Sequence, residues 1–257
     1  MFKGLGVESM KVLDLFSGIG GFSLGLERAG METVAFCEIE KYPQRVLAKH
    51  WPNIPIYEDV RELTYDRLKS DGISGIDVIC GGFPCQDISV AGKQAGIGEG
   101  TRSGLWSECA RLVGEIRPRY AIFENVTALL SGEQGRWFQR VLFDLSEVGY
   151  DAEWHCIPAS ELGANHHRDR VWIIAYPNMQ RREGSLKEAV LWESRLSLQL
   201  VRAFKRWPKR SDIPSPRLSG KNDGIPDRAH RVKALGNAVV PQIPELIGRS
   251  IMAVENA

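Results

Sequence analysis

Residues 76–86 read Ile-Asp-Val-Ile-Cys-Gly-Gly-Phe-Pro-Cys-Gln, and this stretch is the strongest guide to the fold. Its apolar beginning predicts a short buried strand that breaks at Gly81 and Gly82. Pro84 has a fixed φ and disfavours helix in the residue before it, which predicts a stiff turn after the strand. Cys85 then follows the carboxyl end of the strand, where open α/β sheets bind their ligands. A ligand-site thiol is one interpretation of Cys85, and a small buried hydrophobe, the usual fate of a free cysteine, is the other.

The segment after Cys85, residues 87–104, is polar and has glycine at positions 92, 96, 98, 100 and 104. This composition is typical of a mobile loop that closes over a substrate. We therefore expect the loop and Cys85 to belong to one site.

Strand and helix patterns alternate on both sides of this stretch. We predict strands at 10–16, 33–36, 54–57, 120–123, 150–157 and 170–176, and helices at 22–29, 41–50, 61–68, 105–116 and 137–148. The alternation predicts an α/β fold with a doubly wound, mostly parallel sheet. The pattern degrades after Pro177, through a basic and partly helical segment and a stretch rich in Pro, Gly and Ser. Regular structure returns at Val232, with a helix predicted from 242 to 253. We therefore divide the chain into a main domain (1–177), an irregular region (178–230) and a segment that returns to the main domain (231–257).

Composition excludes several classes of protein. No apolar run in the 257 residues approaches the roughly 20 needed to span a bilayer, and the first ten residues lack a signal-peptide pattern. The five cysteines, at 37, 80, 85, 109 and 156, are odd in number and form no C-x-x-C pair. We therefore expect neither a disulfide framework nor a metal site, and a cytoplasmic location.

The net charge of +1 is divided unevenly along the chain. Residues 1–150 carry 16 basic and 20 acidic side chains, whereas residues 181–233 carry 14 basic and 6 acidic ones, a net charge of +8. Such a basic block indicates a polyanionic partner. A solvated surface without a partner is the alternative that charge alone leaves open.

Polar residues follow the ends of the first three predicted strands. The turn Ser17-Gly-Ile-Gly-Gly21 between a strand and a helix is the opening unit of a dinucleotide-type fold, although it lacks the full G-x-G-x-x-G pattern. Glu38 comes twenty residues after Gly18, where a carboxylate accepts hydrogen bonds from the ribose hydroxyls of an adenosine. A helix-capping acid is the alternative for Glu38. Asp59, at the end of the third strand, is placed to meet an adenine amino group.

Together these motifs resemble those of the DNA cytosine-5 methyltransferases, of the compact kind found in bacteria and phages. The resemblance runs from Lys11 to about Ala175 and from about Arg231 to Ser250. The motifs, in family order and spacing, are Asp14-Leu-Phe-Ser-Gly-Ile-Gly-Gly-Phe22, Glu38, Asp59-Val60, Gly82-Phe-Pro-Cys-Gln86, Glu124-Asn-Val126, Arg168-Asp-Arg170 and Gly236-Asn-Ala-Val239.

The resemblance implies a role for each motif. S-adenosylmethionine would be held by Phe16, Gly18, Gly20, Glu38, Asp59 and Val60, with Asn237 and Val239 closing the same pocket. Cys85 would be the nucleophile, Glu124 would hold the N3 edge of a flipped-out cytosine and Arg170 its O2, with Arg168 nearby. DNA contacts would include Gln86, Ser89 and Arg102, the last of which would hold a phosphate or remain solvated. The resemblance implies a catalytic and cofactor-binding domain at 1–177 and a target-recognition region at 178–230.

The chain departs from the family in two places. Most members have Gln-x-Arg-x-Arg where this chain has His166-His167-Arg168-Asp169-Arg170. The target-recognition region is short, and the usual arginine-glutamate segment before the last motif is absent, which favours a loose or short recognition sequence. Within the region, we expect six side chains to contact the phosphate backbone: Arg181, Arg182, Lys205, Arg206, Lys209 and Arg210.

The resemblance implies double-stranded DNA as the partner, a bacterial or phage-infected cell, association with the nucleoid and, as in restriction-modification systems, an accompanying restriction endonuclease. We expect a monomer, because the fold gives no reason for more. Three alternatives remain: a tRNA cytosine-5 methyltransferase, a non-catalytic nucleic-acid-binding relative, and a thiol hydrolase. Intact Cys85 and Glu124 disfavour the second, and the third lacks any evident tie between Cys85 and His166 or His167.

Overall fold

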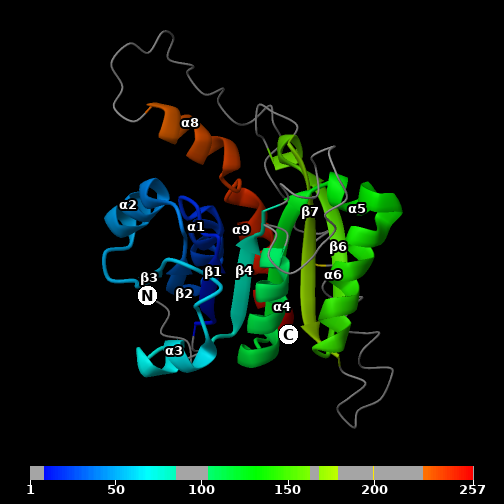
Figure 1. The fold of residues 1–257 in the computed structure, drawn as a ribbon, viewed down its shortest axis with the longest axis horizontal. Helices are drawn as coiled ribbons and strands as arrows, with labels where there is room; N and C mark the ends of the chain where they lie inside the picture. The colour runs from blue at the N-terminus through cyan, green and yellow to red at the C-terminus, as the bar shows by residue number, and fades with distance from the viewer. Residues whose placement is uncertain (1–8, 85–103, 163–167, 179–198, 200–227, 257) are drawn as a thin grey trace.

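The computed structural model describes residues 9–84, 104–162, 168–178, 199 and 228–256 (Figure 1). In this part of the chain a seven-stranded sheet has the order β3-β2-β1-β4-β5-β7-β6. Its strands are β1 (Lys11–Leu15), β2 (Glu32–Cys37), β3 (Ile56–Tyr57), β4 (Val78–Gly82), β5 (Tyr120–Val126), β6 (Tyr150–Pro158) and β7 (Asp169–Pro177).

The strand directions confirm a doubly wound, mostly parallel sheet. Each neighbouring pair from β3 to β5 is parallel, whereas β7 is antiparallel to both β5 and β6. The chain reverses its strand order at β1, because β2 and β3 extend to one side of it and β4 and β5 to the other. Ligands of open α/β sheets bind at such a switch point, beyond the carboxyl ends of the strands.

Helices cover both faces of the sheet. They are α1 (Gly21–Arg28), α2 (Lys41–His50), α3 (Tyr65–Ser70), α4 (Leu105–Ile116), α5 (Ala128–Ser131), α6 (Arg136–Glu147), α8 (Arg228–Asn237) and α9 (Gln242–Glu255), with 3-10 turns η2 (Gly132–Gly135) and η3 (Ala159–Leu162). One core cluster packs α4 and α6 against the sheet, and a second packs α1 and α9 against the opposite face (Figure 1). Successive residues of β1 alternate between these clusters, with Val12 in one and Leu13 in the other. Burial on both faces explains why three of its four buried residues, Val12, Leu13 and Leu15, are apolar; the fourth is Asp14.

The C-terminal helix α9 returns to the first helix of the chain. Gly25 of α1 lies so close to the segment before α9 that a Cβ there would be 2.3 Å from the carbonyl oxygen of Pro241. Gly248 of α9 likewise lies against α1, because its Cβ would be 2.8 Å from the Cβ of Ala29. The packing of α9 on α1 is therefore close and specific. The three-part division at residues 177 and 230 stays a prediction.

Two predicted strand ends were wrong. Strand β4 does not break at Gly81 and Gly82, because both glycines pair with Phe123 and Glu124 of β5. Strand β5 does not stop at Glu124, because β7 pairs with it as far as Val126. The polar residues at these strand ends therefore belong to the sheet and share its rigidity.

One predicted helix start was also wrong, and helix α8 was not predicted. Helix α3 begins at Tyr65, where residue 61 was expected, because the hydroxyl of Thr64 accepts a hydrogen bond from the main-chain N–H of Arg67 and caps the helix there. Helix α8 begins at Arg228, ahead of the expected return of regular structure at 232. In the part of the chain that the structure describes, no helix combines the length and apolar character needed to cross a membrane.

Candidate functional site

The turn between β1 and α1 is held firmly against the end of β2. Phe16, Gly18 and Gly20 adopt positive φ angles of 51°, 53° and 85°. The hydroxyl of Ser17 donates to the carbonyl oxygen of Asp14 at 2.6 Å and accepts from the main-chain N–H of Cys37 at 3.2 Å. The predicted glycine turn is therefore present, and it stands at the switch point of the sheet.

Asp14 ties this turn to α1 from inside the protein. Its carboxylate is fully buried and accepts hydrogen bonds from the hydroxyl (2.7 Å) and main-chain N–H (3.3 Å) of Ser23 in the first turn of α1. Cys80 lies opposite Asp14 in the register of β1 and β4. Burial raises the pKa of Asp14 to about 7, although the bonds from Ser23 act in the opposite direction. Sequence analysis did not single out this role.

Glu38 reaches across from the end of β2 to the glycine turn. One carboxylate oxygen accepts from the N–H of Gly18 at 2.8 Å, and the other accepts from the N–H of Glu40 at 2.7 Å. Glu40 is the N-cap residue of α2, so Glu38 also holds the chain just ahead of this helix, but it is buried and is not the surface helix-capping acid of the alternative interpretation. Glu38 is only 8% exposed, and burial raises its pKa. The next residue, Ile39, is a large apolar side chain that is 60% exposed, which sequence analysis missed.

Asp59 lies at the end of the third strand, as expected, but its carboxylate already has a partner. Arg61 donates to it from its main-chain N–H at 3.0 Å and from Nε at 2.9 Å, and this side chain holds the pKa of Asp59 below its usual range. The side chain of Val60 is buried in the core at 4% exposure. The side chain of Val60 is therefore not placed to contact a ligand.

Glu124 and Arg170 form an ion pair on neighbouring strands. The Nε of Arg170 lies 2.8 Å from a carboxylate oxygen of Glu124, whose side chain is 12% exposed. Burial raises the pKa of the Glu124 carboxyl, and the charges of Arg170 and Arg168 act in the opposite direction. Gly82 lies beside Glu124 in β4, and a Cβ at Gly82 would be 3.1 Å from its other carboxylate oxygen. The absence of a side chain at Gly82 thus leaves room for this carboxylate.

Asn125 connects the end of β5 to the chain that leads to Cys85. Its side chain is 2% exposed and donates from Nδ2 to the carbonyl oxygen of Phe83 at 3.1 Å. Its Oδ1 accepts from the N–H of Val126 at 2.8 Å. Phe83 comes two residues before Cys85, so Asn125 fixes the main chain just ahead of the predicted nucleophile. The motif Glu124-Asn125-Val126 was recognised from sequence, but this role of its second residue was not.

Arg168 and the C-terminal motif meet at the same end of the sheet. Arg168 adopts a positive φ of 34° and donates from Nη1 to the carbonyl oxygen of Gly236. The predicted pocket-closing residues follow: Asn237 is exposed at the end of α8, and Val239 packs against the cluster that contains α1. The structure therefore brings the Arg168-Asp-Arg170 and Gly236-Asn-Ala-Val239 motifs together.

Several predicted site residues lie outside the residues that the structure describes, and their assignments stay predictions. In the catalytic motif and the loop after it, these predicted residues are Cys85, Gln86, Ser89 and Arg102. In the irregular region 178–230, they are Arg181, Arg182, Lys205, Arg206, Lys209 and Arg210. His166 and His167 also fall outside. Among residues 9–84, 104–162, 168–178 and 228–256, no group of three or more His, Cys, Asp or Glu side chains is arranged to hold a metal ion.

Comparisons with known proteins show which family the chain resembles. The model of a family described as C-5 cytosine-specific DNA methylase matches residues 10–212. The Type II methyltransferase M2.BsuMI of Bacillus subtilis is 36% identical over 170 residues, which are 65% of this chain and 42% of that protein. The Type II methyltransferase M.NgoBI of Neisseria gonorrhoeae is 27% identical over 95% of this chain and 81% of that protein. This chain thus spans less than half the length of M2.BsuMI, although it spans most of M.NgoBI.

A solved structure extends the likeness to the whole chain. The crystal structure of a protein encoded within an Escherichia coli prophage covers 97% of this chain and 100% of its own, with a TM-score of 0.68. The two sequences are only 19% identical, so this match bears on the fold alone.

Proposed function

Because the chain belongs to the C-5 cytosine-specific DNA methylase family, we propose that it methylates C5 of cytosine in double-stranded DNA with S-adenosylmethionine as the methyl donor. The observation that carries the proposal is the largely buried carboxyl of Glu124, at the end of β5, paired with Arg170 of β7. The neighbouring strand β4 leads through Phe83 and Pro84 into Cys85. A nucleophile, a carboxyl with a raised pKa and a cation would thus converge on one substrate ring.

The glycine turn and the carboxylates of Glu38 and Asp59 fit the adenosine of the donor. Glu38 accepts one main-chain N–H on each oxygen, and an ionised carboxylate has about four acceptor sites, so it keeps capacity for ribose hydroxyls. Asp59 would accept from the adenine amino group, and exposed Ile39 would offer an apolar surface to the purine. When bound, the donor supplies an electrophilic methyl group on its sulfonium.

Cys85 would activate the cytosine by covalent addition. C5 of cytosine is a weak nucleophile, and addition of the Cys85 thiolate to C6 gives C5 enamine character. Glu124, protonated or sharing a proton with N3, would offset the charge that develops on the ring, and Arg170 would hold O2. After methylation, a water would remove the C5 proton. The electron pair of that C–H bond would restore the ring double bond and expel the Cys85 thiolate.

The substrate base must leave the duplex to reach these residues, because its C5 and C6 atoms are enclosed within the stack. The segment after Gln86 would close behind the flipped nucleotide, with Ser89 and Arg102 on the DNA. The basic side chains of residues 178–230 would contact phosphates. We also propose that the protein acts as a monomer, and that a restriction endonuclease accompanies it, as the Type II names of its relatives suggest.

A side-by-side assay tests the proposal. Transfer of tritiated methyl groups from S-adenosylmethionine is measured on duplex DNA and on tRNA, with Cys85→Ser as the matched variant. We expect transfer to DNA by the wild type and none by the variant, which still binds S-adenosylhomocysteine. Transfer to tRNA alone would replace the proposed substrate, and full activity of Cys85→Ser would refute the nucleophile. Bisulfite sequencing of DNA from expressing cells would then identify the target sequence.

A further inference from the structure

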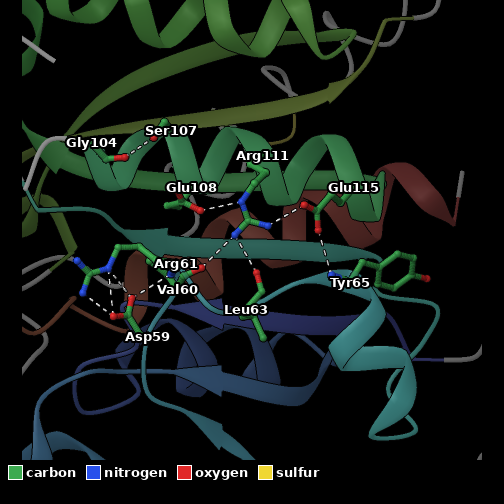
Figure 2. A network of polar contacts seen from close by, with 10 residues as sticks. All are labelled: Asp59, Val60, Arg61, Leu63, Tyr65, Gly104, Ser107, Glu108, Arg111 and Glu115. Atoms are coloured by element: carbon green, nitrogen blue, oxygen red, sulfur yellow. Dashed lines mark hydrogen bonds and ion pairs between the residues drawn. The ribbon is translucent and has the colours of Figure 1, made fainter. Parts of the chain in front are cut away.

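Arg111 of α4 is hydrogen-bonded to its own helix and to the loop between β3 and α3 (Figure 2). Its Nη2 donates to the carbonyl oxygens of Leu63 at 2.8 Å and Val60 at 3.1 Å. Its Nε donates to Glu108 and its Nη1 to Glu115, both at 2.7 Å. The Arg111 side chain is 30% exposed, less than that of any other arginine in the described ion pairs except Arg170. This arginine is therefore fixed on several sides.

The same network also holds the start of α3. Glu115 accepts from the main-chain N–H of Tyr65 at 3.0 Å with the oxygen that Arg111 does not use. The segment from Asp59 to Tyr65 is thus attached to α4 at three main-chain groups: the carbonyls of Val60 and Leu63 and the N–H of Tyr65. Figure 2 shows this segment running alongside α4, with Asp59 at the end where Arg61 reaches it.

The sheet alone holds this segment weakly. Strand β3 contains only Ile56 and Tyr57 and lies at the edge of the sheet. Within the segment, a turn bond from the N–H of Glu62 to the carbonyl of Asp59 leaves the Val60 and Leu63 carbonyls for Arg111. A guanidinium is suited to this task, because its planar fork directs several N–H groups at once, whereas an ammonium is a single point of charge. Besides the burial of Val60 and Leu63 in the core, the hydrogen bonds from α4 thus hold the main chain next to Asp59.

We propose that Arg111 is a positioning residue for the adenine of the methyl donor. This inference rests on the proposed function, because it assumes that Asp59 accepts from the adenine amino group. Arg111 does not touch the donor. It fixes the main chain next to Asp59, so that the carboxylate stands at one place when the purine arrives.

The experiment compares Arg111→Met with the wild type for binding of two probes by calorimetry. S-adenosylhomocysteine has the amino group that Asp59 would accept, whereas S-inosylhomocysteine has an oxygen there. In Arg111→Met the Kd for S-adenosylhomocysteine should rise about tenfold, equivalent to ~1.4 kcal/mol. The Kd for S-inosylhomocysteine should change less, so the preference for adenine should shrink. In steady-state assays KM for S-adenosylmethionine should rise while kcat changes little.

Three further variants test whether the effect acts through Asp59 and not through a general loss of stability. Arg111→Lys should show an intermediate Kd for S-adenosylhomocysteine, because a lysine reaches one carbonyl but not all the partners of Arg111. If Arg111→Met fails to fold, Arg111→Lys takes its place in the comparison. In an Asp59→Ala background, Arg111→Lys should have almost no further effect on the adenine preference. Arg249→Met is the matched control: Arg249 pairs with Glu245 four residues earlier on α9, and none of its described bonds is to a main-chain carbonyl.

An unchanged preference for adenine in folded Arg111→Met and Arg111→Lys, with only a lower Tm, would overturn the inference and leave Arg111 a structural residue. Failure of the wild type to bind S-adenosylhomocysteine would instead remove the proposed function. The two failures are therefore distinguishable.

Discussion

At the scale of single residues, the fully buried carboxyl of Asp14 and the largely buried carboxyl of Glu124 have different partners and therefore different uses. Glu124 stands beside Arg170 and Arg168 at a strand end that faces the proposed base. Asp14 is enclosed between β1, β4 and α1, and its hydrogen bonds go to Ser23 of the protein itself. Burial raises the pKa of both carboxyls, but only for Glu124 do we propose that the proton is shared with a substrate.

Glu124→Gln should lower kcat without preventing donor binding. A positioned acid contributes about 10²–10⁴-fold to a rate, so we expect a fall of that order in single-turnover methyl transfer. Glutamine keeps the shape and a hydrogen bond to N3 but cannot exchange a proton with it. Because protonated Glu124 is the useful form, wild-type activity should fall as pH rises through its raised pKa. A pH profile of kcat that is equally steep in Glu124→Gln would contradict the assignment.

Asp14 should make folding stability depend on pH. Its pKa rises from 3.8 to about 7 on folding, so the folded state binds a proton that the unfolded state loses. The contribution to stability is complete below about pH 4 and is lost as pH rises through 7. Three pKa units correspond to about 4 kcal/mol as an upper limit. Asp14→Asn should abolish this dependence, because the amide is neutral and its oxygen can still accept from Ser23.

Urea unfolding at pH 5 and pH 8 would measure the effect of Asp14. The control is Asp66→Asn, since Asp66 is an exposed acid whose pKa is lowered by Lys69. If wild type and Asp14→Asn lose equal stability between the two pH values, Asp14 does not titrate as described.

At the scale of elements, the sequence predicted element bounds that depend on the local residue pattern. It did not predict strand ends that depend on pairing with a neighbouring strand. Helix α4 was predicted at its observed bounds, Leu105–Ile116, because its apolar spacing is regular and Pro118 follows. The end of β5 was placed too early, because Glu124 and Asn125 are polar in sequence but are paired with β7 in space. Roles of Asn125 and Arg111 were also missed, because each bonds a carbonyl more than forty residues away along the chain. Such partners leave no local signal.

The contact between α1 and the C-terminal segment gives a prediction at this scale. Gly25→Ala should destabilise the protein even though alanine favours helix, because its Cβ would fall 2.3 Å from the carbonyl oxygen of Pro241. Overpacking of this kind typically costs about 1–3 kcal/mol. Denaturant unfolding of Gly25→Ala would measure the cost. Gly114→Ala on α4 is the control, since its nearest contact would be a methyl of Val148 at 3.3 Å. Equal stabilities of the two variants would argue against a close α1–α9 contact.

At the scale of the whole molecule, the fold and the donor half of the site follow from the sequence better than the DNA half does. Glycine turns and strand-end acids have fixed spacings, since parallel strands bring their carboxyl ends to one edge. The separation of Glu38 from Gly18 predicted a ribose-binding carboxylate, and the structure shows that this carboxylate accepts a hydrogen bond from Gly18 itself. The proposed DNA interface would depend on residues 178–230, whose charge is evident from the sequence but whose pattern predicts no geometry. Charge alone predicts affinity and not sequence choice.

The basic region therefore yields a prediction about salt. Each phosphate contact on B-DNA contributes about 0.9 to the slope of log K against log salt concentration. Arg181→Gln combined with Arg182→Gln should thus reduce the slope by about 2 and weaken binding to unrelated duplexes equally. Fluorescence anisotropy across a series of salt concentrations measures the slope. Lys69→Gln, which removes a basic side chain paired with Asp66 on α3, should leave it unchanged. A wild-type affinity independent of salt would show that this excess of positive charge does not face DNA.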